Sequence, residues 1–269
     1  MATDSAADPR ILVDRPAEHV VRIRFNRPSK RNAIDQATRL ALLEAVTDVL
    51  SDQSTRAVVL GGVGGVFSAG GDLPSMAGLT PDGARARMAE IHSICRLWAA
   101  APLPIVSAME GVAAGASVGL ALLGDYVVAG PSSRVLVPFI KLGLTPDWGL
   151  MATLPRRIGL AAARRVMLAG GTFNGAEALA AGLVDELCED DTAVMDRAIA
   201  QASTFAALPR EAAARIKLRL SGGPEALEAV LAAEMEDQIA CLTHPEFVEG
   251  WAAQMERRPA DFLSVKAAP

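Results

Sequence analysis

The sequence predicts an α/β fold that ends in a helical region. Up to about residue 190, short apolar runs typical of strands alternate with longer segments of helical spacing, and short loops join them. Beyond that point only helical patterns follow. We therefore expect a flexible tail over residues 1–10, an α/β core over 11–200, and a helical region over 201–269 that serves as a lid or an assembly surface.

The expected strands all lie in the first half of the chain. Residues 19–25 alternate apolar and basic side chains, which predicts a strand with one buried and one exposed side. Residues 57–61 and 104–108 are almost wholly apolar and indicate short buried strands, and a further strand is expected over 126–129.

Helical spacing predicts the remaining elements. A first helix over residues 35–52 has one apolar stripe, made of Leu40, Leu43, Val46 and Leu50. A second helix, over 85–100, ends before two prolines and has the apolar residues Met88, Ile91, Cys95 and Trp98. Further helices are expected over 114–123, after Pro146, and over 161–169, 175–181, 191–208, 210–220 and 224–241.

Composition restricts the class of protein. The 269 residues are 51% hydrophobic and 21% charged, which is typical of a globular protein with a sizeable core. The net charge of −5 argues against nucleic acid or an anionic membrane as the main partner. The apolar runs are too short to span a bilayer, and residues 1–10 lack a secretory signal. Three widely spaced cysteines show no metal-binding spacing, so we expect reduced thiols in a cytoplasmic protein without a metal site.

Two glycine-rich turns separate predicted strands from predicted helices. They cover residues 61–73 and 110–120. Runs of Gly and Ala let a ligand approach the backbone closely and let successive N–H groups point at one position. Glycine content alone, however, favours a mobile loop for the first turn and tight strand–helix packing for the second.

Together with three further segments, these turns resemble the enoyl-CoA hydratase/isomerase (crotonase) family. The two turns contribute Phe67-Ser-Ala-Gly-Gly-Asp-Leu73 and Gly111-Val-Ala-Ala-Gly-Ala-Ser-Val-Gly119, and the other matches begin at Asn26, Lys141 and Thr172. The similarity keeps the same order over residues 10–200. It implies a spiral core of repeated β-β-α turns, assembly into homotrimers or pairs of trimers, and an acyl-CoA thioester substrate. Coenzyme A is then part of the substrate, and no separate cofactor is expected.

The resemblance also implies an oxyanion hole. By position, the backbone N–H groups of Gly71 and Ala116 hold the thioester oxygen, and each such donor typically contributes about 3–4 kcal/mol. The family usually has glycine where Ala116 stands, but alanine keeps the N–H. The substrate-binding residues implied in the same way are Ser68, Ala69, Gly70, Asp72, Gly115, Phe139 and Trp148, and Asp72 is expected to fix its loop.

The two glutamates with which hydratases of this family add water are missing. Gly119 and Phe139 stand at their positions, and neither side chain transfers a proton. Asp147 remains nearby, where some isomerases and the ring-forming and dehalogenating branches carry an aspartate. We therefore expect an isomerase in which Asp147 moves a proton from C2 to C4 of a 3-enoyl-CoA. A competing interpretation makes Thr145 an N-cap, Pro146 the first helical residue and Asp147 a helix-start acid.

Three alternative functions remain open. The first is the hydratase activity that gives the family its name. The second is thioester hydrolysis or dehalogenation, with Asp147 as nucleophile and His92 activating water. His92 falls near the catalytic histidine of the dehalogenase branch, although a helix-surface histidine with satisfied hydrogen bonds is the better interpretation. The third is an acyl-CoA binder without proton chemistry.

Overall fold

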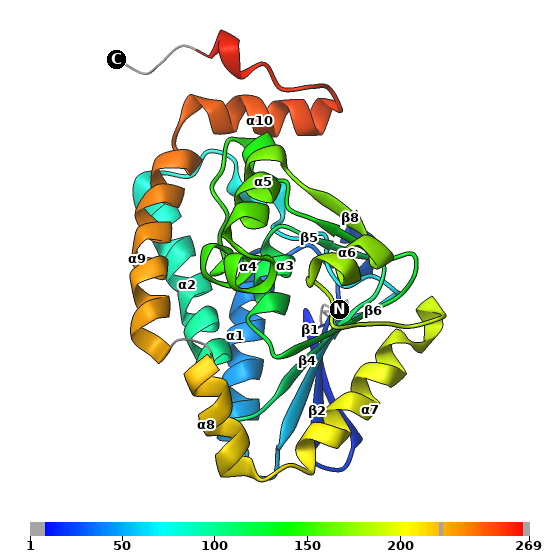
Figure 1. Ribbon diagram of the computed structural model, residues 1–269. Coiled ribbons are helices and arrows are strands. Elements are labelled where there is room, and N and C mark those ends of the chain that lie inside the picture. The colour runs from blue at the N-terminus through cyan, green and yellow to red at the C-terminus, as the bar shows by residue number, and fades with distance from the viewer. Residues whose placement is uncertain (1–8, 221–222, 266–269) are drawn as a thin grey trace, which may run out of the picture.

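Two sheets form the core of the protein, whose computed structural model describes residues 9–220 and 223–265 (Figure 1). The main sheet has the order β1-β2-β3-β4-β6-β9, and the smaller sheet the order β5-β7-β8. Only β1 runs antiparallel in the main sheet. The strands are β1 (Ile11–Ala17), β2 (Val20–Phe25), β3 (Ala57–Gly62), β4 (Ile105–Met109), β5 (Val112–Ala114), β6 (Tyr126–Ala129), β7 (Arg134–Leu136), β8 (Thr172–Asn174) and β9 (Glu186–Leu187).

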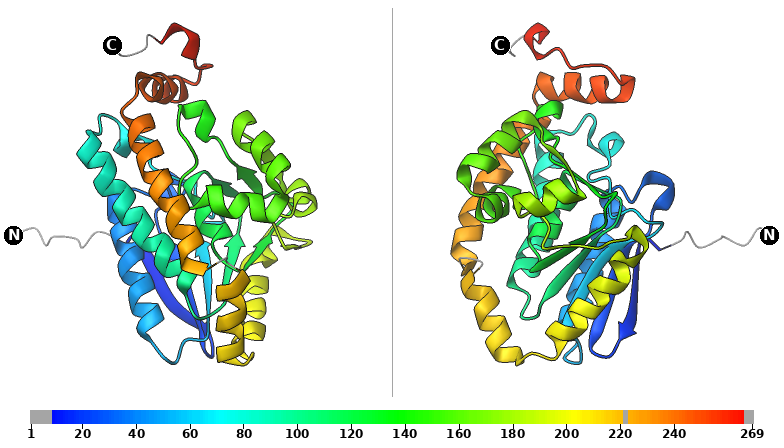
Figure 2. Two further views of the ribbon diagram at one scale, coloured as in Figure 1. Left: turned by 60° about the vertical axis from the view of Figure 1, so that its left-hand side comes forward. Right: turned by 45° about the vertical axis from the view of Figure 1, so that its right-hand side comes forward.

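Helices cover both faces of the main sheet. On one face, α1 (Gln36–Ser51) and α2 (Pro81–Ala100) pack against the strands, and α9 (Gly223–Leu242) lies along the outside of α2 (Figure 2). On the other face lies α7 (Val194–Ala206). The remaining helices are α3 (Ala116–Leu122), α4 (Leu150–Ile158), α5 (Leu160–Ala169), α6 (Gly175–Ala181), α8 (Arg210–Leu220) and α10 (Pro245–Glu256).

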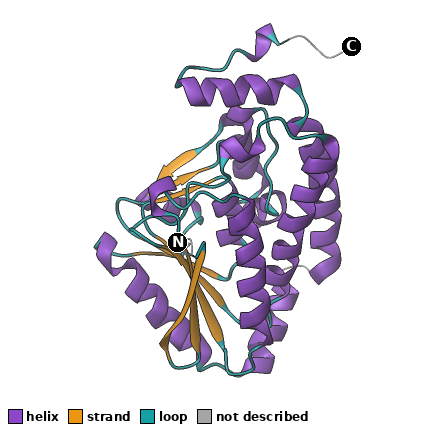
Figure 3. Ribbon diagram, turned by 180° about the vertical axis from the view of Figure 1, so that it is seen from behind, coloured by secondary structure: helices purple, strands orange, loops and turns teal. Residues whose placement is uncertain are grey.

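The chain repeats a β-β-α turn, as the resemblance implies. β4 enters the main sheet, β5 enters the smaller sheet, and α3 follows; β6, β7 and α4 repeat the same order. Figure 3 shows the strands gathered in two separate groups. The two preceding turns replace the second strand by single bridges, Ile34 with Gly71 and Ser68 with Ala113. Both glycine-rich turns therefore lie in the same layer, next to the smaller sheet.

Successive side chains of each strand point to opposite faces of the main sheet and so belong to two separate apolar cores. Val21, Ile23 and Phe25 of β2 are buried in the core that contains α1 and α2, as the alternation at residues 19–25 predicts. Val59 of β3 points the other way and belongs to a second core with Ala198 of α7. The parallel strands are thus buried on both faces.

Several expected elements differ from the structure. The predicted stripe of the first helix is confirmed in part, because Val46 is buried and Leu43 and Leu50 pack against the core, whereas Leu40 is 49% exposed. Leu42 and Val49, which lie outside the predicted stripe, are buried as well. Apolar residues on more than one side of this helix allow more than one stripe. The second helix begins four residues before the expected start, because Thr80 caps it. The strands β1, β5, β7, β8 and β9 and the helix α10 were not predicted.

Within the described ranges, no helix is long and apolar enough to cross a membrane. The same residues contain no group of three or more His, Cys, Asp and Glu that could hold a metal ion. The three cysteines form no disulfide, and Cys95 is buried in the main core.

Candidate active site

The first glycine-rich turn is fixed by short backbone and side-chain bonds. Ser68 is completely buried and donates its hydroxyl to the carbonyl oxygen of Asn32 at 2.7 Å. The same hydroxyl accepts the N–H of Gly70 at 3.1 Å. The N–H of Ala69 donates to the carbonyl oxygen of Arg31 at 2.8 Å. These bonds hold the turn in one conformation before any ligand binds.

The two turns approach each other so closely that only glycine fits at their contact. A Cβ atom on Gly70 would stand 2.3 Å from the carbonyl oxygen of Ala114 and 3.5 Å from the nitrogen of Ala116. Gly70 also has a φ of +86°, which favours glycine. Among the described residues, the N–H groups of Gly71 and Ala116 have no recorded acceptor. Two free donors therefore lie on neighbouring turns.

Asp72 and Gly115 are the sequence neighbours of the two donor residues, Gly71 and Ala116. Asp72 accepts a hydrogen bond from Nη1 of Arg27 at 3.0 Å, which agrees with its expected role in fixing the loop. Gly115 precedes α3 with a φ of +51°, and the ring of Phe139 lies 3.5 Å from the position that its Cβ would take. The buried Phe139 therefore forms an apolar wall beside the second turn.

Asp147 lies in a loop and is not a helix-start residue. Its segment is not helical, and α4 begins only at Leu150, with Gly149 at the N-cap position. The interpretation of Thr145 as an N-cap was therefore wrong; its hydroxyl is buried and has no hydrogen-bond partner in the described chain. The side chain of Asp147 is 2% exposed, and its Oδ1 is also without a partner among these residues.

Burial controls the charge of this carboxyl group. Loss of solvent and, after it, the negative charge of Glu234 raise the pKa of Asp147, and the charge of Arg87 acts in the opposite direction, so that the pKa is about 7. Desolvation is thus the largest influence on the pKa of Asp147. A carboxyl group with a pKa near neutrality exchanges a proton readily in either direction.

Helix α9 holds both ends of the Asp147 segment. The amide of Gln238 donates to the carbonyl oxygen of Thr145 at 2.8 Å. The N–H of Gly149 donates to Oε2 of Glu234 at 3.0 Å. Gln238 and Glu234 are both buried, so these bonds are shielded from water. The C-terminal helical region therefore belongs to the structure of the site.

His92 is part of the same buried network. Its Nε2 lies 3.1 Å from Oε1 of Glu234, and the side chain is 1% exposed. The expectation of a helix-surface histidine was therefore wrong, because α9 covers this side of α2, although the expected hydrogen-bond partner exists. Glu234 thus connects His92 to the backbone next to Asp147.

Trp148 occupies the place where the first hydratase glutamate is expected. A Cβ on Gly119 would stand 2.7 Å from the Cβ of Trp148 and 3.0 Å from the carbonyl oxygen of Asp147. A longer side chain at Gly119 has no room. Trp148 itself has a φ of +57°, an unfavourable conformation for a bulky residue, and it is buried.

Sequence reasoning missed three residues of this site: Arg87, Glu234 and Gln238. Arg87 on α2 is 5% exposed, and its Nη2 lies 3.3 Å from the position that a Cβ on Gly71 would take. One signal was available, because Arg87 precedes Ile91 by one helical turn and so shares its buried face. No comparable signal marks Glu234 or Gln238, whose role depends on where α9 lies.

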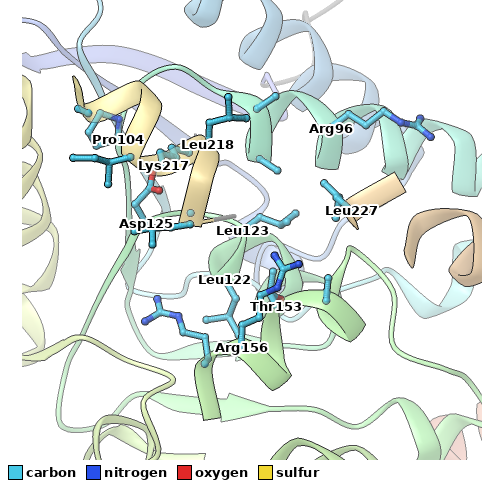
Figure 4. Close-up of a pocket in the computed structure, with 18 of the residues that line it drawn as sticks. Arg96, Pro104, Leu122, Leu123, Asp125, Thr153, Arg156, Lys217, Leu218 and Leu227 are labelled. Carbon is cyan, nitrogen blue, oxygen red and sulfur yellow. Dashed lines mark hydrogen bonds and ion pairs between the residues drawn. The ribbon is translucent and has the colours of Figure 1, made fainter. Parts of the chain in front are cut away.

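A large pocket lies away from this site. It has a volume of about 790 Å³ and lies between the ends of α2 and α3 and the helices α4, α8 and α9 (Figure 4). Leu122, Leu123 and Leu227 contribute to its apolar wall, and the ion pair of Lys217 with Asp125 (2.7 Å) lies at one side. None of the candidate residues lines it.

Comparison with known proteins gives matches over most of the chain. Residues 15–265 match the family described as enoyl-CoA hydratase/isomerase. A probable enoyl-CoA hydratase of Mycobacterium tuberculosis is 32% identical, over 93% of this chain and 98% of its own length. The crystal structure of an enoyl-CoA hydratase from Mycobacterium avium subsp. paratuberculosis gives a TM-score of 0.83 at 30% identity and covers 94% of this chain and 98% of its own.

Two other relatives have different names. A 1,2-epoxyphenylacetyl-CoA isomerase of Escherichia coli is 31% identical over 90% of this chain and 94% of its own length. A 4-chlorobenzoyl coenzyme A dehalogenase of an Arthrobacter species is also 31% identical, over 91% of this chain and 90% of its own length. All of these names refer to a coenzyme A thioester, but they describe different reactions.

Proposed function

The chain belongs to the enoyl-CoA hydratase/isomerase family, and from this premise we propose that it is an enoyl-CoA isomerase. Membership of the family makes the protein an acyl-CoA-processing enzyme with the crotonase fold. The proposal of isomerase activity rests on the buried carboxyl group of Asp147, which has an unpaired Oδ1 and a pKa of about 7.

The proposed reaction needs one group that moves a proton and one group that holds negative charge. The thioester oxygen accepts hydrogen bonds from the N–H groups of Gly71 and Ala116. Ionised Asp147 removes a proton from C2 of a 3-enoyl-CoA, and the electron pair of that C–H bond delocalises onto the thioester oxygen as a dienolate. Protonated Asp147 then returns the proton to C4, and the double bond ends between C2 and C3. Donors aimed at the developing charge lower the barrier.

Hydration is the less favoured reaction because its second acid is missing. Adding water requires one group to activate the water and another to deliver a proton. Gly119 and Phe139 supply neither, and Trp148 fills the space beside Gly119.

To test for isomerase activity, the protein is incubated with a 3-enoyl-CoA, and the conjugated 2-enoyl thioester is followed by absorbance and mass spectrometry. Hydration of crotonyl-CoA without isomerisation would contradict the proposal.

Dehalogenation or thioester hydrolysis is the second candidate. It is favoured by the hydrogen bonds that link His92 through Glu234 to Gly149, two residues after Asp147, and by the similarity to dehalogenases. In this reaction Asp147 attacks as nucleophile and His92 activates water. The side chain of His92 is, however, held by Glu234 and is almost completely buried, which restricts access for water. Release of chloride from 4-chlorobenzoyl-CoA that disappears in the His92→Gln variant would favour this candidate.

The remaining alternative is an acyl-CoA binder, which would bind thioesters without converting any of them.

We further propose that the chain assembles as a homotrimer or as a pair of trimers. Exposed apolar side chains on α5 and α8, Leu168, Ile216 and Leu220, support an assembly surface. The cytoplasmic location, the domain boundaries and the lack of a cofactor beyond the substrate's coenzyme A stay predictions.

A further inference from the structure

Arg87 is a buried cation without a partner. Its guanidinium forms no hydrogen bond and no ion pair within the described ranges, and Nε is fully enclosed. An unpaired charge in a protein interior is costly, because desolvation is not offset by a counter-ion. We expect such a group where a ligand from outside the chain supplies the missing counter-ion.

The carboxylates near Arg87 are already engaged or too distant to pair with it. Glu90 accepts from Nε of Arg39 at 2.9 Å, and Asp72 accepts from Arg27 at 3.0 Å. Asp147 acts on the charge of Arg87 but forms no ion pair with it. Burial and the charge of Arg39 lower the pKa of Arg87 to about 10, so the guanidinium remains positive at neutral pH.

The position of Arg87 defines what can reach it. Nη2 lies 3.3 Å from the Cβ position of Gly71, whose N–H is the proposed donor to the thioester oxygen. The phosphates of coenzyme A are separated from the thioester by the long pantetheine arm, so they lie far from Arg87 when the thioester is at Gly71. An anion next to Arg87 therefore belongs to the acyl group.

We propose that Arg87 binds a carboxylate on the acyl chain, so that the substrate class is the thioesters of dicarboxylic acids. This inference rests on the acyl-CoA site of the proposed function. The planar guanidinium donates two parallel N–H bonds to a carboxylate, a geometry that a purely hydrocarbon chain leaves unused. Met76, whose sulphur lies 3.6 Å from the Cβ position of Gly71, supplies an apolar surface beside the methylene groups.

The first test compares matched thioesters on the unmodified protein by isothermal titration calorimetry. Glutaryl-CoA is paired with pentanoyl-CoA, and adipyl-CoA with hexanoyl-CoA, so that only the terminal carboxylate differs. A charge-assisted pair predicts that the acidic member of at least one pair binds about 10- to 100-fold more tightly. Equal or tighter binding of the neutral member in both pairs would overturn the proposal.

The second test uses two arginines of the same helix. Arg87→Gln should remove the preference for the acidic thioester while leaving the neutral one within about threefold of its original affinity. Arg85→Gln is the matched control, because Arg85 is exposed and pairs with Glu236. Arg87→Lys, which keeps the charge, should retain part of the preference and serves if the glutamine variant does not fold. A preference that survives in folded Arg87→Gln contradicts the assignment.

Failure of this inference and failure of the proposed reaction are distinguishable. Asp147→Asn should abolish isomerisation and keep the acidic preference, because binding needs no proton transfer. A wild-type protein that prefers dicarboxylic thioesters but never isomerises them refutes only the proposed reaction. Equal effects of Arg87→Gln on acidic and neutral substrates would assign Arg87 to the enolate and overturn the carboxylate proposal. Binding of none of the four thioesters overturns both.

Discussion

At the scale of single residues, the site combines two buried ionisable side chains that lack full pairing. Asp147 comes from the loop before α4 and Arg87 from α2, and each shifts the pKa of the other. Unsatisfied buried polar groups are rare in folded proteins, because each one costs free energy. Arg87 lies next to Gly71, and Asp147 interacts electrostatically with Arg87, so these groups indicate a place that a polar ligand completes.

Asp147→Asn tests the acid/base role at nearly constant volume. The amide cannot accept the C2 proton, so isomerisation of a 3-enoyl-CoA should fall by about 100- to 10,000-fold, the usual contribution of a general acid or base. Binding of a saturated acyl-CoA should be retained. Steady-state kinetics and calorimetry measure the two quantities. An unchanged rate would remove Asp147 from the mechanism.

The pH dependence of the reaction follows from the same carboxyl group. Proton removal needs the ionised form, and burial places the pKa of Asp147 at about 7. The kcat/KM for isomerisation should therefore rise with pH through about 7 and level off above it. A profile that is already flat from about pH 5 upward would mean that the carboxyl group is ionised far more easily than its burial predicts.

The raised pKa also makes the folded state less stable at higher pH. The native protein binds the proton of Asp147 up to about pH 7, whereas the unfolded chain loses it near 3.8. Stability should therefore fall as pH rises through this window, by up to about 4 kcal/mol, and Asp147→Asn should remove that slope. Urea unfolding of both proteins across the window measures the difference. Parallel curves would contradict the expected burial.

The sequence identifies the residues of the site unevenly. Asp147 is predictable, because the residues around it match a family pattern and the two glutamates are missing. Glu234 is not, because its importance arises only when α9 packs on α2 and brings its carboxylate to Gly149. The burial of His92 was missed for the same reason. The roles of Gly71 and Ala116 stay predictions, although the structure brings their turns together.

At the scale of elements, α9 determines the geometry of the loop that carries Asp147. Bonds at Thr145 and Gly149 fix its two ends, and Trp148 between them adopts a strained φ. A conformation of this kind persists only where the surroundings determine it. The C-terminal region therefore acts on the site directly.

Glu234→Gln tests this influence while keeping one acceptor oxygen. The glutamine oxygen can still accept the N–H of Gly149, but the negative charge that raises the pKa of Asp147 is lost. The midpoint of the kcat/KM profile should therefore move to lower pH. Glu236→Gln on the exposed side of α9 is the control and should leave the midpoint in place. Identical shifts in both variants would point to a general change in helix packing.

Elements with a local signal were predicted well. The strands at 57–61 and 126–129 and the helix at 175–181 are confirmed almost to the residue, because burial on both faces and a capping box leave clear patterns. The edge strand β1 and the peripheral helix α10 are two of the elements that were missed. Both have exposed sides and mixed patterns, so tertiary contacts decide their conformation.

At the scale of the whole molecule, the spiral brings together segments that are far apart in sequence. Each turn adds a strand to the main sheet and a segment to the second layer, so the turns at Gly70 and Gly115 become neighbours. The expected β-β-α spiral is confirmed, and it explains why residues from α2, α3, α9 and two loops meet at one site. Length and composition alone could not have predicted this arrangement.

The proposed assembly belongs to this scale and tests the apolar surface of α8. Leu220 is 79% exposed and Ile216 lies one turn earlier, so the free chain presents apolar area that association would cover. Sedimentation or light scattering should give three or six times the 28.0 kDa of one chain. Ile216→Glu with Leu220→Glu should shift the distribution toward single chains, because charges would be buried without partners.

Val13→Glu is the matched control, because Val13 is exposed on β1, which belongs to the main sheet and not to the C-terminal helices. It should leave the mass unchanged. The C-terminal helices carry both the proposed assembly surface and Glu234, so dissociation of the α8 variant should also lower the proposed isomerase activity. If single chains prove fully active, α9 holds the Asp147 loop without help from neighbouring copies. A wild-type protein that sediments as one chain at micromolar concentration would instead refute the assembly.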